Sequence, residues 1–111
     1  MTIKDFRKLC KEHNAMDYAM AIADTLSDEE YTFTARNLRV NSDIENVEIH
    51  FSMNNKLVDY TNDYMTVEEF LKWAGSFKNY SIKIVDISYT WLCESYVKFL
   101  DEDKVVQLYF I

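Results

Sequence analysis

Apolar residues recur at helical spacing over residues 66–75, the stretch with the clearest structural signal in the chain. It begins with Thr-Val-Glu-Glu, the form of a capping box, in which the Thr66 hydroxyl accepts from the Glu69 amide and the Glu69 carboxylate accepts from the Thr66 amide. An apolar face follows, and Gly75, the only glycine, is expected to end the helix in the left-handed conformation. The pattern predicts a short helix from Val67 to Ala74.

A second apolar stripe at helical spacing covers the first 26 residues. Thr2 followed by Asp5 resembles a capped helix start. Because the stripe continues without interruption, residues 3–26 are expected to form either one kinked helix or two successive helices. We favour a break near Asn14, which can cap a second helix.

Elsewhere the period of apolar residues is close to two, which predicts β-strands. Strands are expected from Tyr31 after an acidic turn, over 47–53, and along 81–92. Asn54-Asn55 suits a tight turn into another strand over 56–60. The last pair of strands is expected to form a hairpin, with 96–100 and 105–110 on either side of 101–104.

The order of these elements favours a single α+β domain over residues 1–111. We expect an N-terminal helical segment, a mainly antiparallel sheet of about five or six strands, and the helix 67–74 packed on one face of that sheet. No internal repeat, low-complexity tract or linker is recognised in the sequence. An apolar edge strand at 105–111 is a candidate for dimerisation, so the chain is expected to be a monomer or a homodimer.

The charge of the chain is strongly negative and unevenly distributed. Residues 1–12 hold four basic and two acidic residues, a balance of +2, while the other 99 residues hold eight basic and seventeen acidic residues, a balance of −9. This field disfavours direct binding of nucleic acid. No cationic leader precedes an apolar run, and no apolar segment is long enough to cross a bilayer, so a cytoplasmic protein is expected.

Few side chains suggest catalysis, and no cofactor or metal is expected. One glycine excludes the glycine-rich phosphate loops. Cys10 and His13 share a helix face and could form a nucleophilic pair, but both fit the apolar stripe and are interpreted as a core thiol beside a partly buried histidine. The two cysteines and two histidines lack the close pairs of zinc modules, and the polar turn around 59–63 lacks the glycine and terminal glutamate of a calcium loop.

Short length, scarcity of glycine and proline, acidity and abundant tyrosine resemble the small inhibitor proteins of phages and mobile elements, anti-CRISPR proteins among them. The resemblance is one of type and composition. It implies a non-enzymatic inhibitor in the host cytoplasm that mimics nucleic acid and binds a larger basic protein, such as a nuclease or a CRISPR effector. Immunity proteins that neutralise bacterial nuclease toxins share these features and are the first alternative. A small enzyme or ligand-binding domain using the region of Cys10 and His13 is the second.

The turn between the last two strands is the predicted centre of the partner-binding surface. Its three neighbouring carboxylates repel one another unless a cation meets them, and turn-tip charges contribute little to stability. Two flanking residues and a second acidic turn are expected to extend the surface. The predicted binding residues are Asp101, Glu102, Asp103, Glu94, Tyr96, Asp28, Glu29 and Glu30.

Overall fold

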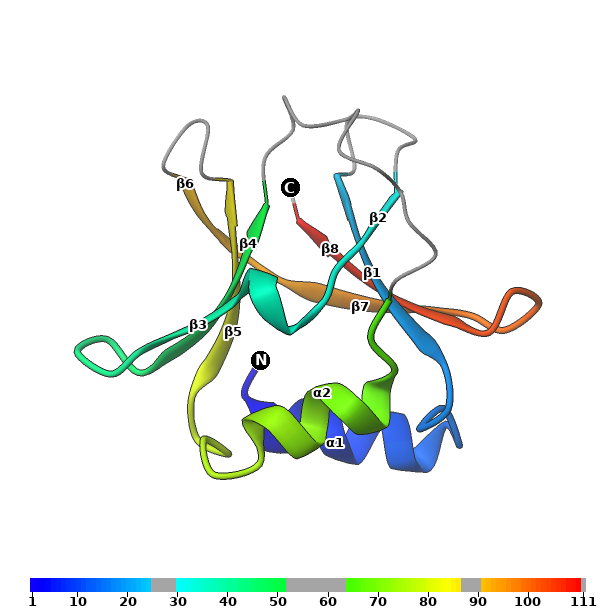
Figure 1. Cartoon of the computed structure of the whole chain (residues 1–111). Coiled ribbons are helices and arrows are strands. Elements are labelled where there is room, and N and C mark those ends of the chain that lie inside the picture. The colour runs from blue at the N-terminus through cyan, green and yellow to red at the C-terminus, as the bar shows by residue number, and fades with distance from the viewer. Residues whose placement is uncertain (25–29, 52–63, 87–90, 111) are drawn as a thin grey trace.

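The structure is a computed structural model that describes residues 1–24, 30–51, 64–86 and 91–110. These residues form two α-helices, one short 3₁₀ helix and eight strands (Figure 1). The predicted α+β class is therefore confirmed. In chain order the elements are α1 (Ile3–Glu12), β1 (Ala19–Asp24), β2 (Glu30–Thr32), η1 (Ala35–Asn37), β3 (Leu38–Asn41), β4 (Asn46–Phe51), α2 (Val67–Ala74), β5 (Ser81–Asp86), β6 (Trp91–Glu94), β7 (Tyr96–Leu100) and β8 (Val105–Phe110).

The strands form two mainly antiparallel sheets of four, where we expected one mainly antiparallel sheet of about five or six strands. Sheet 1 has the order β2-β1-β8-β7, and sheet 2 has the order β3-β4-β5-β6. In each sheet the two central strands are parallel and the outer strands are antiparallel to their neighbours. Strand β8 pairs on both sides, so the predicted dimerisation through an edge strand at 105–110 is wrong; Ile111 lies outside the described residues.

The chain is built from two halves with the same order of elements, a helix followed by four strands. Each sheet joins the first hairpin of one half to the second hairpin of the other half. Short stretches of sequence match accordingly, so the expectation of no internal repeat is wrong. The matching stretches are Met1–Phe6 (MTIKDF) with Met65–Phe70 (MTVEEF), Asp17–Asp24 (DYAMAIAD) with Asn79–Asp86 (NYSIKIVD), and Leu38–Phe51 with Val97–Phe110.

The two halves exchange backbone hydrogen bonds at their helix starts. The first amides of an α-helix have no acceptor within the helix. Here the Ile3 amide donates to the Tyr80 carbonyl, and at the matching position the Val67 amide donates to the Tyr18 carbonyl, both at 2.9 Å. Three further pairs of bonds, each running from an amide of one half to a carbonyl of the other, occupy matching positions. The Lys4 amide donates to the Lys78 carbonyl, and the Glu68 amide donates to the Met16 carbonyl. The other two pairs, donor first, are Ile82–Met1 with Met20–Met65 and Ser81–Glu45 with Ala19–Lys104.

Both predicted helix caps are present, and each is a capping box. The Thr66 hydroxyl accepts from the Glu69 amide at 3.2 Å, and the Glu69 carboxylate accepts from the Thr66 amide at 3.2 Å. Thr2 and Asp5 make the same pair of bonds at the start of α1. Gly75, however, has φ −59° and is right-handed, so its predicted left-handed cap is wrong. A Cβ atom there would lie only 3.1 Å from a backbone carbonyl of α2.

The expectation of helix over residues 3–26 is correct only as far as Glu12. Asn14 has φ 56°, and the Ala15 amide donates to the Cys10 carbonyl, which closes the helix in a Schellman motif. The following residues form β1 instead of a second helix. Its core-facing side chains Met20 and Ile22 alternate with alanines, so residues 19–23 are all apolar and the pattern imitates a helical stripe.

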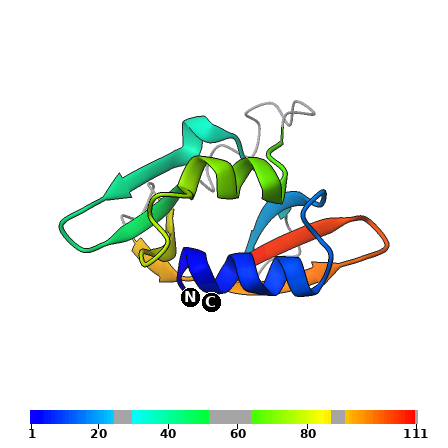
Figure 2. The same cartoon turned by 90° about the horizontal axis from the view of Figure 1, so that it is seen from below.

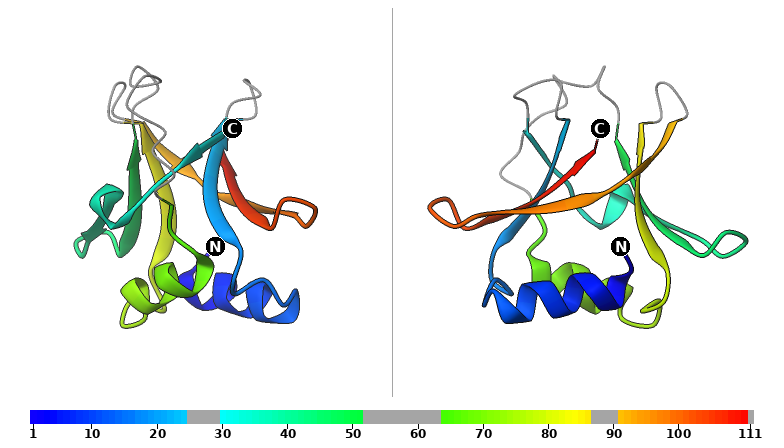
Figure 3. Two further views of the ribbon diagram at one scale, coloured as in Figure 1. Left: turned by 45° about the vertical axis from the view of Figure 1, so that its right-hand side comes forward. Right: turned by 180° about the vertical axis from the view of Figure 1, so that it is seen from behind.

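The core lies between the two sheets, and α1 and α2 lie side by side across one end (Figures 2 and 3). Phe70 of α2 is fully buried at the centre. Its ring meets Phe6 of α1 edge-on at 5.7 Å and Phe33 edge-on at 6.4 Å. The predicted packing of helix 67–74 against the sheets is confirmed.

Removing either cap should destabilise the fold. We expect Thr66→Ala and Thr2→Ala each to lower the free energy of unfolding by about 1 kcal/mol, because each leaves a helix amide without its acceptor. Thr66→Ser, which keeps the hydroxyl, should retain most of the stability. Denaturant titration followed by circular dichroism measures the effect. Equal stability of the alanine and serine variants would contradict this role.

Candidate functional site

The acidic turn between β7 and β8 is anchored to the C-terminal end of α1. Asp101 Oδ1 accepts a hydrogen bond from the Tyr18 hydroxyl at 2.8 Å and lies 2.7 Å from His13 Nε2. The His13 ring stacks on Phe99 of β7 with 3.9 Å between ring centroids. Hydrogen bonds from His13 and Tyr18 lower the pKa of Asp101. The bond between Tyr18 and Asp101 in turn raises the pKa of Tyr18. Asp101 is therefore held within its own chain.

The other two carboxylates of the turn carry no such anchor within the described part of the chain. Glu102 and Asp103 are exposed, and neither has a hydrogen-bond or ion-pair partner among the described residues. Backbone bonds from Asp103 and Lys104 to Leu100 and Asp101 close the turn, and Lys104 adopts φ 52°. The predicted repulsion among three carboxylates is thus relieved at Asp101 alone.

A matching turn joins β3 and β4 in the other half. Glu45 has φ 51°, at the position equivalent to Lys104. Asp43 and Glu45 are exposed without described partners, and Ile44 between them is 54% exposed. The two hairpins project from opposite sides of the molecule (Figure 1). Our sequence analysis did not include this turn in the predicted binding surface, although the repeat is the signal that could have indicated it.

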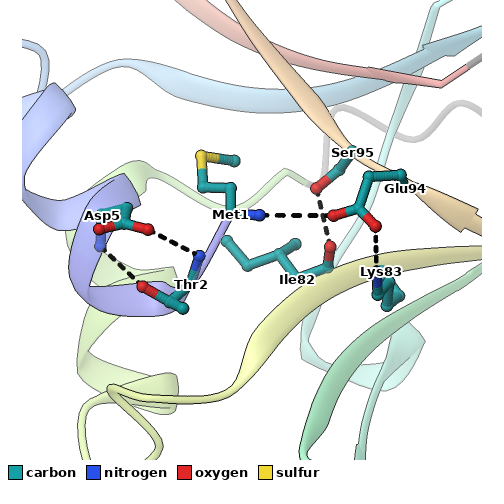
Figure 4. A network of polar contacts seen from close by, with 7 residues as sticks. All are labelled: Met1, Thr2, Asp5, Ile82, Lys83, Glu94 and Ser95. Atoms are coloured by element: carbon teal, nitrogen blue, oxygen red, sulfur yellow. Dashed lines mark hydrogen bonds and ion pairs between the residues drawn. The ribbon is translucent and has the colours of Figure 1, made fainter.

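Glu94 has partners inside the chain and lies on a different sheet. It forms an ion pair with Lys83 of β5 and lies 3.4 Å from the terminal amine of Met1 (Figure 4). The hydrogen bond from Lys83 is the main cause of the lowered pKa of Glu94. The next residue, Ser95, is buried and donates to the Ile82 carbonyl at 2.8 Å, where the chain passes from sheet 2 into sheet 1. The expectation that Glu94 extends the surface of the acidic turn is therefore wrong.

Tyr96 and Glu30 lie on the outer face of sheet 1. The strand register places Tyr96, Tyr109, Ala23 and Glu30 in one row across β7, β8, β1 and β2. Tyr96 and Tyr109 stack with 5.4 Å between ring centroids. These two predicted binding residues thus share a face, whereas Asp28 and Glu29 lie outside the described residues.

The geometry disfavours the catalytic alternative at Cys10. The thiol is fully buried in the core, and burial raises its pKa to about 12, so it stays protonated at neutral pH. His13, its proposed partner, is engaged by Asp101 and Phe99. Within the described ranges, no group of three or more histidine, cysteine or acidic side chains is arranged to hold a metal ion. The polar turn at 59–63 lies outside those ranges.

Comparisons with known proteins give no match to a family model, a curated protein or a solved structure. Among the described residues, no helix has the length and apolar character needed to cross a membrane.

Acidification should test the anchoring of Asp101. Its pKa is lowered in the folded protein from the ordinary 3.8, so its contribution to stability is complete above that value and is lost as pH falls through the lowered pKa. We expect the wild type to unfold at higher denaturant than Asp101→Asn at pH 5, with the difference shrinking below about pH 4. Glu102→Gln is the control, because that carboxylate has no described partner. A difference between wild type and Asp101→Asn that is as large at pH 2 as at pH 5 would contradict the prediction.

Proposed function

We propose that this protein is a non-enzymatic inhibitor that binds a larger, basic, nucleic-acid-processing protein by presenting carboxylates in place of phosphates. The observation that carries the proposal is the anchored turn between β7 and β8, whose Glu102 and Asp103 side chains are exposed without a cation among the described residues. Carboxylates in this state attract a cationic surface and release its counterions, as phosphates do.

Anchoring makes the turn suitable for recognition. Asp101 is bonded to two side chains from the α1 region, and the hairpin is paired along its full length with five registered residue pairs. A partner therefore meets a turn that is already ordered, so less conformational entropy is lost on binding. Asp101 thus supports the binding surface, while Glu102 and Asp103 make the contacts.

Charge around the molecule also favours an oriented encounter. Exposed Lys4, Lys8 and Lys11 lie on α1, at the helical end, while the two acidic turns project from the sheets (Figure 1). A basic partner is attracted to the turns and repelled by α1, where basic residues outnumber acidic ones. This separation of charge would steer the approach of the partner.

The compositional resemblance to phage inhibitors makes a CRISPR effector or a nuclease the first partner class to test, in the cytoplasm of a host cell. An immunity protein that neutralises a nuclease toxin would use the same contacts, so the identity of the bound protein separates the two. Both readings require a cationic surface on the partner. Tight binding to a neutral or acidic surface would overturn the proposal.

Neutralising the free carboxylates should weaken binding without unfolding the protein. For Glu102→Gln/Asp103→Asn, we expect the Kd for a basic nuclease or CRISPR effector to rise by at least about tenfold, or about 1.4 kcal/mol, and the salt dependence to become shallower. Isothermal titration at several salt concentrations, beside thermal melts, measures both effects.

The matched control is Glu12→Gln/Glu68→Gln, which makes the same change in net charge at the helical end, where both side chains are exposed. Its affinity should stay close to that of the wild type. Equal losses in the two double variants would show that only net charge matters, and an unchanged affinity in the turn variant would rule out this turn as the contact.

A further inference from the structure

The turns at the tips of the two hairpins share a backbone conformation, but only the β3–β4 turn carries an apolar side chain. Glu45 (φ 51°) and Lys104 (φ 52°) occupy matching positions, and both are left-handed. The residue before the left-handed position is Ile44 in the β3–β4 turn and Asp103 in the β7–β8 turn. Ile44 is the most exposed large hydrophobic residue in the described part of the chain, at 54%.

The fold does not require an isoleucine at this position. Turns favour Gly, Pro, Asn, Asp and Ser, whereas β-branched residues favour strands. The matching turn has Asp103 and forms the same left-handed corner. Ile44 also lies outside the hydrophobic core. Single exposed apolar side chains are common on protein surfaces, but this one stands where the duplicated backbone accepts a carboxylate.

The turn holds Ile44 in an ordered position. Strands β3 and β4 are paired in register up to Asn41 and Asn46, directly beside the turn. The Glu45 carbonyl accepts a hydrogen bond from the Ser81 amide at 3.0 Å, which ties the turn to the second half of the chain. A partner that binds Ile44 therefore has little backbone entropy to remove.

We propose that Ile44 is an apolar anchor that enters a hydrophobic pocket with a basic rim on the partner protein. This proposal rests on the proposed inhibitory function and adds a second contact to it. Asp43 and Glu45 flank the anchor, are exposed, and have no ion-pair partner among the described residues. Protein interfaces combine a buried apolar centre with a polar rim that excludes water. The rim that complements Asp43 and Glu45 is cationic.

The two hairpin tips contact separate surfaces of the partner. Their hairpins project from opposite sides of the molecule (Figure 1), so one flat surface does not reach both tips. Changes at distant sites that share no contacts usually add in free energy. Losses of affinity at the two tips should therefore multiply.

A carboxylate in place of Ile44 separates an apolar contact from a charge contact. Ile44→Asp introduces the residue type that the matching turn already carries. If charge alone governed binding, the added carboxylate would strengthen the attraction to a basic partner. An apolar anchor predicts the opposite. We expect the Kd for a basic nuclease or CRISPR effector that binds the wild type to rise by at least about tenfold, whereas Ile44→Val should bind nearly as tightly as the wild type.

Isothermal titration at several temperatures and salt concentrations gives a second readout. Burial of apolar surface makes the heat-capacity change of binding negative. Ile44→Asn removes the apolar side chain but no charge, so it should make this heat-capacity change less negative and leave the salt dependence of Kd unchanged. The matched control is Leu9→Glu, which replaces a 41% exposed apolar side chain on α1 by a carboxylate and should not weaken binding. Thermal melts verify that each variant is folded.

Combination with the β7–β8 turn variant separates this anchor from the proposed function. Ile44→Asp added to Glu102→Gln/Asp103→Asn should raise Kd by about a hundredfold, because two tenfold losses multiply. Wild-type affinity of a folded Ile44→Asp variant, beside a loss in Glu102→Gln/Asp103→Asn, overturns the anchor alone. Equal weakening by Ile44→Asp and Leu9→Glu also overturns the anchor. A wild type that binds no basic nuclease or CRISPR effector overturns the proposed function and the anchor together.

Discussion

The rest of the structure depends on the exchange of backbone hydrogen bonds between the two halves of the chain. Neither helix satisfies its own first amide; Ile3 needs a carbonyl from the second half, and Val67 needs one from the first. The sheets carry the same reciprocity, since each contains one hairpin from either half. The bonds at the helix starts and the parallel pairs β1–β8 and β4–β5 all join one half to the other. Half of the chain alone would therefore leave two strand edges and a helix start without partners. Folding of either half therefore requires the other.

Local signals in the sequence were sufficient for the elements whose partners are close in sequence. The capping boxes at Thr2 and Thr66 each need a residue only three positions away, and the hairpin 96–110 is closed by a short turn. Strand β1 was misread because it is a central strand with alanines on its outer side, so the alternation of its core residues is hidden. The repeat was missed because the matching stretches are short and are separated by connections of unequal length.

The acidic turn was predicted in location but not in the state of its carboxylates. Composition and alternation indicated an acidic turn at 101–103, and the structure places it at the tip of a hairpin. Whether a carboxylate is available depends on partners distant in the chain: His13 is 88 positions from Asp101, and the terminal amine is 93 positions from Glu94. Neither separation leaves a periodic or motif signal, so the bound and free carboxylates look alike in the sequence.

Differences between the two halves carry information because the backbone is shared. The position of Asp101 is occupied by Ser42 in the other hairpin, and that turn has no bond equivalent to those from His13 and Tyr18 among the described residues. The fold therefore does not require the anchor, whereas exposed carboxylates occur in both turns. A side chain that is present in one half and absent from the matching position of the other is not needed for the shared fold. Such side chains are the part of the molecule most open to selection for binding. By this reasoning the anchor of Asp101, which is absent from the matching position, is the feature that distinguishes the proposed binding surface from the scaffold.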